Sequence, residues 1–357
     1  MRAQAPSYDG RVPNLLNVLR NPIAYIAERW TPTQRVLQRA TLSSVVMAVI
    51  IIVTGGAVRL TGSGLGCSTW PKCGPDSLVA TPEMGINGAI EFGNRLLTYV
   101  LCAAVGWAII AARSAKPVRP QVARLAWIQF WVVMINAVLG GISVLVKLNP
   151  YVVAGHFLAA IALLTVSVVT WQRSREGDAE PRPLVGKPVR QLVLLLVAAT
   201  GALVTVGTVV TGAGPHPGDN SHVPRMPVDW QTIAQLHADL AWAVVALSLA
   251  VWLVLRAVDA PAGPRARTRE LVIVLLAQGV IGYVQYFTDV PEILVGIHML
   301  GASLVWIAVL RVLLSLRERD LPPQQAPAPA AEAAPAEPDA SVRPAATQSP
   351  APEPASR

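Results

Sequence analysis

The chain has 357 residues, of which 53% are hydrophobic and 14% are charged, and its net charge is +8. Soluble globular proteins usually carry about 25% charged residues, so this composition argues against a soluble domain. A basic chain can bind nucleic acid, but no nucleic-acid motif accompanies these charges. We therefore expect no nucleic acid among the partners.

Eight apolar runs are long enough to cross a bilayer, because about 20 apolar residues span its hydrocarbon core as a helix. They lie at 41–61, 88–112, 125–146, 151–171, 190–211, 231–255, 271–289 and 293–316. The first run is too far from the start and too long for a cleavable signal peptide. The sequence predicts an all-α polytopic membrane protein with eight transmembrane helices.

The segments outside these runs have their own composition. Residues 1–40 form a basic segment in which "NPIAYIAERW" has the pattern of a helix lying on the membrane surface, with a solvated tail as the alternative. Residues 176–189 form a linker. Residues 319–357 are dominated by Pro and Ala, which cannot bury a core, so we expect a disordered tail.

Positive charge is unevenly distributed between the two sides of the predicted membrane. Of the 29 Lys and Arg residues, 24 lie in the termini, the even-numbered loops and the adjoining helix ends. The other five are Arg59, Lys72, Arg95, Lys147 and Arg225. Because cytoplasmic loops carry the excess of Lys and Arg, we expect a multi-pass protein of the cell (inner) membrane with both termini in the cytoplasm.

The chain also repeats itself. His298 follows His156 by 142 residues, and His237 follows Asn94 by 143 residues. This register predicts a duplication into an N-terminal four-helix half at 41–175 and a C-terminal four-helix half at 190–318. Each half has an even number of spans, so the halves are parallel repeats that form two pseudo-symmetric four-helix bundles.

Three histidines lie inside the predicted spans near their outer ends. Ionisable residues in spans usually face a bundle interior, and facing helices of a bundle can ligate haem iron. His237 and His298 are therefore the expected axial ligands of one haem, and His156 holds the equivalent place in the N-terminal half. A non-haem metal and a proton relay are weaker alternatives. His216 and His222 are expected to be solvated loop residues, with metal capture as a minor alternative.

The N-terminal half differs at the position that matches His237, which is Asn94. Glu91, Asn94 and Arg95 are spaced i, i+3 and i+4, so they share one helical face. The C-terminal half has alanines in place of Glu91 and Arg95. This asymmetry indicates that one half stores electrons while the other carries out chemistry, with Glu91 as acid or base. A plain Glu91–Arg95 pair at a helix end is the alternative.

Two cysteines lie in the first outer loop, in "GCSTWPKCG". A disulfide between Cys67 and Cys73 is allowed outside the cytoplasm. A structural crosslink and a redox-active pair both fit the spacing, whereas a single short pair offers too few ligands for a metal. Cys102, inside a span, is expected to be an apolar filler.

The stretch "GAVRLTGSGLGC", the following "WPKC", the later "EFGNR" and three helix-borne histidines together resemble the heme A synthase family, from about 41 to 316. The resemblance implies an eight-helix membrane enzyme that oxidises the C8 methyl of haem O to the formyl of haem A through an alcohol and a geminal diol. Haem A is the cofactor of cytochrome c oxidase. The resemblance implies haem b on His237 and His298, a substrate haem ligated by His156, and an external Cys67–Cys73 pair. Arg95 is then expected to bind a propionate or to hold Glu91 ionised.

One departure from the family pattern concerns the substrate haem. The family motif E-x-x-H-R reads "EFGNR" here, so the substrate is either five-coordinate through His156 or carries water bonded to Asn94. The expected partners are haem O, haem A, heme O synthase (protohaem farnesyltransferase), an electron acceptor and membrane lipid, and a homo-oligomer is left open. The alternatives are a di-haem b-type cytochrome that exchanges electrons with quinone and a transporter built from parallel repeats.

Overall fold

A computed structural model describes residues 21–319 of the chain. The first half of the predicted N-terminal segment, residues 1–20, and the predicted disordered tail from 320 onward lie outside the described residues. The elements in chain order are α2 (Pro22–Arg29), α3 (Gln34–Leu60), η1 (Pro82–Met84), α4 (Gly85–Ser114), α5 (Pro120–Leu145), α6 (Pro150–Arg175), β1 (Arg182–Pro183), α7 (Lys187–Ala213), α8 (Trp230–Ala257), α9 (Ala262–Phe287), α10 (Glu292–Ser315) and β2 (Arg317–Glu318).

Eight of these helices, α3 to α10, are long and apolar enough to cross a membrane. The predicted all-α polytopic fold is confirmed. Several helices begin earlier than their apolar runs. For example, α3 begins at Gln34, where Thr33 caps it by accepting a hydrogen bond from the N–H of Val36. An apolar run marks only the part of a helix that fits the hydrocarbon core of the bilayer. The helix itself extends beyond this run, until a capping residue ends its backbone hydrogen bonding.

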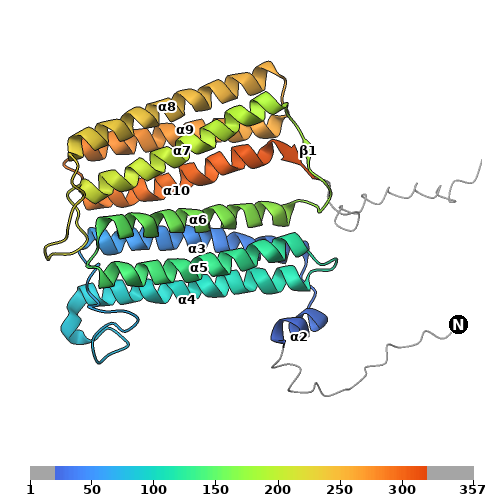
Figure 1. Ribbon diagram of the computed structural model, residues 1–357. Coiled ribbons are helices and arrows are strands. Elements are labelled where there is room, and N and C mark those ends of the chain that lie inside the picture. Colours follow the sequence, from blue (N-terminus) through green and yellow to red (C-terminus); the bar gives the residue numbers. More distant parts are fainter. Residues whose placement is uncertain (1–20, 320–357) are drawn as a thin grey trace, which may run out of the picture. The chain divides into compact units, whose positions relative to one another are not determined.

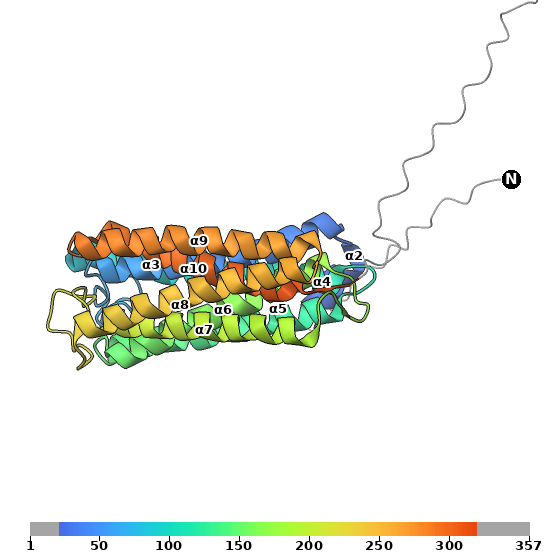
Figure 2. The ribbon, with the colours of Figure 1, turned by 90° about the horizontal axis from the view of Figure 1, so that it is seen from above.

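The eight long helices run along a common axis (Figures 1 and 2). Helices α3 to α6 contact one another in a closed ring, and α7 to α10 do the same with the same order of neighbours. Contacts of α10 with α3 and α6, and of α6 with α7, join the two groups. Buried apolar residues form two clusters. One lies in α7 to α10, and the other lies in α3 to α6 and also includes Leu310 and Leu314 of α10. This neighbour pattern is compatible with the predicted duplication.

The turns repeat as well. Between α5 and α6, Lys147 and Leu148 have φ of 52° and 57°, and between α9 and α10, Asp289 and Val290 both have φ of 59°. Non-glycine residues rarely adopt this left-handed conformation. Each pair is offset from the other by 142 residues, which is the offset between His156 and His298. Both turns therefore deliver the next helix, with its histidine, in the same way.

The stretch "NPIAYIAERW", expected as a surface helix or a solvated tail, contains the helix α2, whose first turn is capped by Asn21 and which packs against α4. One short ladder was not predicted from the sequence: the predicted linker contains β1, which pairs antiparallel with β2 directly after α10. This ladder lies at the inner end of the bundle, by which we mean the end that carries Gln34 and Ser315. The opposite end, with Leu60 and Phe287, is called the outer end.

Candidate functional site

The structure brings His237 and His298 together near the outer end of the C-terminal half. Their ring centroids are 6.4 Å apart, and the ring planes differ by 61°. An imidazole nitrogen lies about 2 Å from a bound metal, so two rings on opposite sides of one iron have centroids about 6 Å apart. The observed separation therefore fits two axial ligands of a single haem.

A glycine on a neighbouring helix makes room for each of the three histidine rings. A Cβ added to Gly207 would lie 3.0 Å from Cε1 of His237, and one added to Gly282 would lie 3.2 Å from Cε1 of His298. Gly140 stands in the same relation to His156, at 3.1 Å. Gly140 and Gly282 are also offset by 142 residues. Sequence reasoning missed these glycines: the repeat register relates Gly140 to Gly282, but only packing shows that they lie against the histidine rings.

We predict that Gly282→Ala weakens haem retention by about 10-fold or more, because changes that disturb the orientation of a metal-ligating histidine have effects of this size. The matched control is Gly279→Ala on the same helix, since a Cβ at Gly279 meets nothing within 4 Å. Haem content per protein after gel filtration measures the effect. Equal haem loss in both variants would show that the contact with His298 is not the cause.

The C-terminal half is loosely packed around its histidine pair. The buried residues of α8 are Val244, Ser248, Val251 and Leu255, all on the inner side of His237. The buried residues of α9 and α10 likewise lie toward the inner end. Nδ1 of His298 is buried and has no hydrogen-bond partner among residues 21–319. Two imidazoles that face each other from different helices of one bundle fit a porphyrin with axial ligands.

A non-haem metal centre fits the described residues less well. Protein zinc sites take three or four ligands from His, Cys, Asp or Glu. Within residues 21–319 no three such side chains converge on a common point. The donor set here is a pair of imidazoles, which haem iron can take as its two axial ligands.

In the N-terminal half, Glu91 is held from two sides. Its Oε1 pairs with Nε and Nη2 of Arg95, and the Nε contact is 3.1 Å. Its Oε2 accepts a hydrogen bond from the backbone N–H of Cys67 at 2.7 Å. The side chain is buried, with an exposed fraction of 5%. The Glu91–Arg95 pair considered as an alternative is thus present, and the acid is also attached to the first outer loop.

The same loop connects this pair to the helix beside His156. Cys67 and Cys73 form a disulfide, and between them the carbonyls of Thr69 and Lys72 each accept a hydrogen bond from Arg95 at 3.1 Å. The indole of Trp70 lies against Gly141, so closely that a Cβ there would clash with it. The preceding residue on α5 is the glycine that contacts His156.

The position equivalent to His237 has different chemistry. Asn94 is half-buried, and its Oδ1 accepts a hydrogen bond from the hydroxyl of Thr54 on α3 at 2.8 Å. The structure therefore places three of the predicted residues, Glu91, Asn94 and Arg95, on one side of α4, each with a partner from a neighbouring segment.

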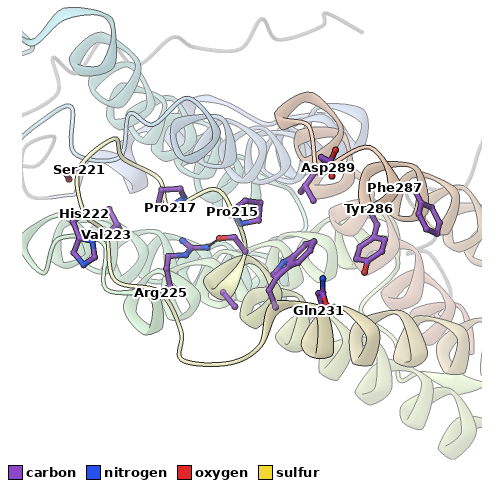
Figure 3. Close-up of a pocket in the computed structure, with 14 residues that line it drawn as sticks. Pro215, Pro217, Ser221, His222, Val223, Arg225, Gln231, Tyr286, Phe287 and Asp289 are labelled. Atoms are coloured by element: carbon purple, nitrogen blue, oxygen red, sulfur yellow. Dashed lines mark hydrogen bonds between the residues drawn. The ribbon is translucent and has the colours of Figure 1, made fainter.

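A pocket of about 990 Å³ opens at the outer end of the C-terminal half, between the α7–α8 loop and the α9–α10 turn (Figure 3). Trp230 begins α8 seven residues before His237 and stacks on Tyr286 at 5.7 Å. Arg225 lines the pocket and donates to the carbonyls of Thr211, at 2.9 Å, and Gly214. Burial lowers the pKa of Arg225. The outer rim of this half is therefore aromatic and cationic, and neither His237 nor His298 lines this pocket.

The predicted loop histidines have different environments. His222 is exposed and lines this pocket, as expected for a solvated residue. His216 is not simply solvated, because its Nε2 lies 2.8 Å from the carbonyl of Val290. Its own carbonyl accepts from Nε of Arg59 at 2.9 Å. His216 therefore joins the end of α3 to the turn before α10.

Comparison with known families decides the identity of the chain. The model of the COX15-CtaA family, described as cytochrome oxidase assembly protein, matches residues 38–310. The chain belongs to this family. The family predicted from the sequence motifs is thereby confirmed, and this COX15-CtaA member is a multi-pass membrane protein.

Relatives of this COX15-CtaA member carry the name Heme A synthase. One from Staphylococcus epidermidis is 29% identical over 205 residues, which cover 53% of this chain and 65% of the relative. One from Staphylococcus saprophyticus is 26% identical over 290 residues, or 75% of this chain and 91% of the relative. One from Geobacillus kaustophilus is 28% identical over 319 residues, or 82% of this chain and 96% of the relative. The chain thus matches less than two thirds of the length of the first of these relatives.

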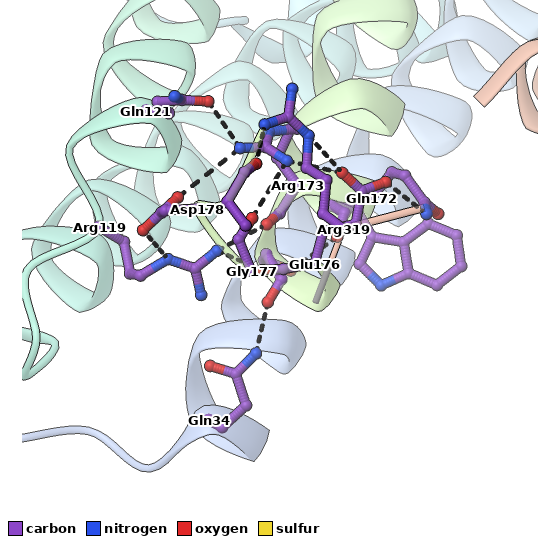
Figure 4. Close-up of polar contacts among 12 residues, drawn as sticks. Gln34, Arg119, Gln121, Gln172, Arg173, Glu176, Gly177, Asp178 and Arg319 are labelled. Atoms are coloured by element: carbon purple, nitrogen blue, oxygen red, sulfur yellow. Dashed lines mark hydrogen bonds and ion pairs between the residues drawn. The ribbon is translucent and has the colours of Figure 1, made fainter. Parts of the chain in front are cut away.

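The inner end of this COX15-CtaA protein carries a polar cluster that the sequence did not reveal (Figure 4). Arg119 is fully buried and pairs with Asp178, with Nε 2.9 Å from Oδ2. Arg173 pairs with Glu176 at 2.6 Å and also donates to Gln121. The cluster fastens the start of α5 to the end of α6, and no predicted site residue belongs to it.

We predict that Arg173→Met lowers the free energy of unfolding by about 3 kcal/mol, because removing one partner of a buried ion pair leaves the other charge uncompensated. The control is Arg113→Met, which removes an exposed arginine from the last turn of α4. Unfolding of the detergent-solubilised protein by SDS titration measures both. If the two variants unfold at the same SDS concentration, the cluster does not stabilise the fold.

Proposed function

We propose that this chain is a heme A synthase that oxidises the C8 methyl of haem O to the formyl of haem A. Membership of the COX15-CtaA family and the names of the relatives support this proposal. The observation that carries it is the inequality of the two halves. One half has two imidazoles at the separation of axial ligands, and the other has a single histidine together with a buried acid.

The C-terminal half is proposed to bind haem b permanently through His237 and His298. Bound there, haem b would supply one-electron storage and transfer. The protein contributes the two imidazoles and the glycines behind them. Arg225 at the outer mouth is suited to the carboxylates at the edge of a porphyrin, since guanidinium groups bind carboxylates strongly.

The N-terminal half is proposed to bind haem O as substrate through His156. Glu91 is the proposed catalytic residue, as the base that takes up a proton or as the charge that stabilises a cationic carbon during oxidation of the methyl group. The Cys67 amide and Arg95 hold both of its oxygens, so its carboxylate has one fixed orientation. Trp70 and the disulfide-closed loop cover the outer end of this half and are expected to limit water access.

The proposed setting is the inner membrane, with both termini in the cytoplasm and both haem sites near the outer face. Heme O synthase is the proposed supplier of the substrate, and an electron acceptor must remove the electrons released by the oxidation. The two-site arrangement with Asn94 in one half disfavours a pure di-haem cytochrome, which would need similar ligands in both halves.

The test is haem extraction and mass analysis of membranes from cells that express this chain and also make haem O. Heme A synthase activity predicts haem A, with the alcohol as a smaller species, only when the chain is present. Unchanged haem O in the presence of folded, haem-loaded protein would refute the proposal.

A further inference from the structure

The internal repeat places the neutral amide of Asn94 in the N-terminal half at the position that His237, the proposed haem ligand, holds in the C-terminal half. In the C-terminal half, His237 on α8 faces His298 on α10. In the N-terminal half, Asn94 on α4 takes the place of His237, and His156 on α6 takes the place of His298. Both are part of the same ring of helices. An amide is a poor ligand for haem iron, because haem ligands in proteins are imidazole, thiolate, thioether or phenolate groups.

The contacts of Asn94 determine what this amide can do instead. Its Oδ1 accepts a hydrogen bond from the hydroxyl of Thr54 at 2.8 Å. An asparagine amide has one acceptor oxygen and a nitrogen with two donor hydrogens. Since the oxygen is engaged on the side of α3, the NH2 group is directed away from Thr54. Asn94 is half-buried, so part of the residue remains accessible.

We propose that His156 is the only protein ligand of the iron in the N-terminal half, and that Asn94, aligned by Thr54, donates a hydrogen bond to a small exchangeable ligand on the opposite face. The ligand class is a water molecule or another small species with an accepting atom. This inference rests on the proposed function, because it assumes that a haem occupies the N-terminal half.

The difference between the halves then has a functional reason. A cofactor must stay bound through many turnovers, and two histidines hold it. A substrate must enter and its product must leave, and one protein ligand allows faster exchange than two. Catalytic metal sites in general keep one position open, whereas structural sites are closed.

The test uses the full chain purified with haem in both halves, examined by electron paramagnetic resonance and by cyanide and carbon monoxide titration. The wild type should contain one low-spin and one high-spin haem, and only the high-spin haem should bind the probes. Asn94→His should convert the second haem to low spin and abolish carbon monoxide binding. Asn94→Leu should keep the open position but weaken cyanide binding about 10-fold, because a hydrogen bond to a charged group is lost.

Thr54→Val is the second variant, since it leaves Asn94 in place and removes only the hydroxyl that aligns it. It should weaken cyanide binding in the same direction without changing carbon monoxide binding. Two low-spin haems in the wild type, or unchanged cyanide affinity in both Asn94→Leu and Thr54→Val, would overturn the inference and leave the proposed function standing. Lack of any haem in the N-terminal half, together with unconverted haem O, would overturn both.

Discussion

Replacing Glu91 by glutamine is expected to lower the rate of haem A formation by about 100- to 10,000-fold, the range that proton transfer by a positioned side chain contributes. Glutamine has nearly the same size and keeps an oxygen that can accept from the Cys67 N–H. The substitution therefore removes the charge and the basic function while the loop contact can persist. Haem O, or its alcohol, should accumulate in membrane extracts, and mass analysis of the extracted haem measures this.

The matched control for this prediction is Glu83→Gln. Glu83 is an exposed acid in η1, directly before the helix that carries Glu91. This control should form haem A at the wild-type rate. The low-spin haem of the C-terminal half should be unaffected in both variants, because neither acid lies near His237 or His298. Normal haem A formation by Glu91→Gln would rule out its proposed catalytic role.

The second large effect is expected for His298→Ala, which should reduce the low-spin haem content of the purified protein at least about 10-fold. The ring of His298 is one of only two imidazoles at ligand separation in the C-terminal half of the described chain. Its removal leaves His237 as a single ligand and opens a space beside Gly282. Optical spectra and haem-to-protein ratios measure the loss, and added imidazole should partly restore the low-spin spectrum by entering that space.

His222→Ala is the control for this substitution, since it removes an exposed histidine from the α7–α8 loop. It should keep the full low-spin content. If His298→Ala retains a normal low-spin haem without added imidazole, then His298 is not an axial ligand and the assignment of the C-terminal site is wrong.

The spans, and the histidines and acid within them, could be predicted because they depend on the local sequence. Apolar length predicts a spanning helix, and an ionisable group inside such a helix indicates an interior position. The register between His156 and His298 could be read from numbering alone. The left-handed pairs in the two inter-helix turns, which follow the same offset, add structural support to that register.

Contacts between segments that lie far apart in the chain could not be predicted from the sequence. The bond from the Cys67 amide to Glu91 uses a backbone group, which leaves no trace in residue type. Gly207 and Gly282 are ordinary in composition, and only packing shows that each one accommodates an imidazole. From the sequence, Arg119 and Arg173 were counted only among the positive charges that set the orientation in the membrane. In the structure both side chains are buried and paired with acids at the inner end.

The contacts around Glu91 also bear on the role of the disulfide. Cys67 supplies the amide that holds Glu91, and the loop that the disulfide closes supplies two carbonyls to Arg95. A structural crosslink explains these contacts without any redox chemistry of the sulfurs. The geometry therefore favours the structural alternative over the redox-active pair.

The central claim is that the two halves hold haem unequally, as a cofactor between two histidines and as a substrate on one. The most direct test is electron paramagnetic resonance of purified wild type, His237→Ala and His156→Ala. The account predicts that the low-spin signal disappears in His237→Ala and persists in His156→Ala. A low-spin signal that survives in His237→Ala, or that is lost in His156→Ala instead, would contradict it.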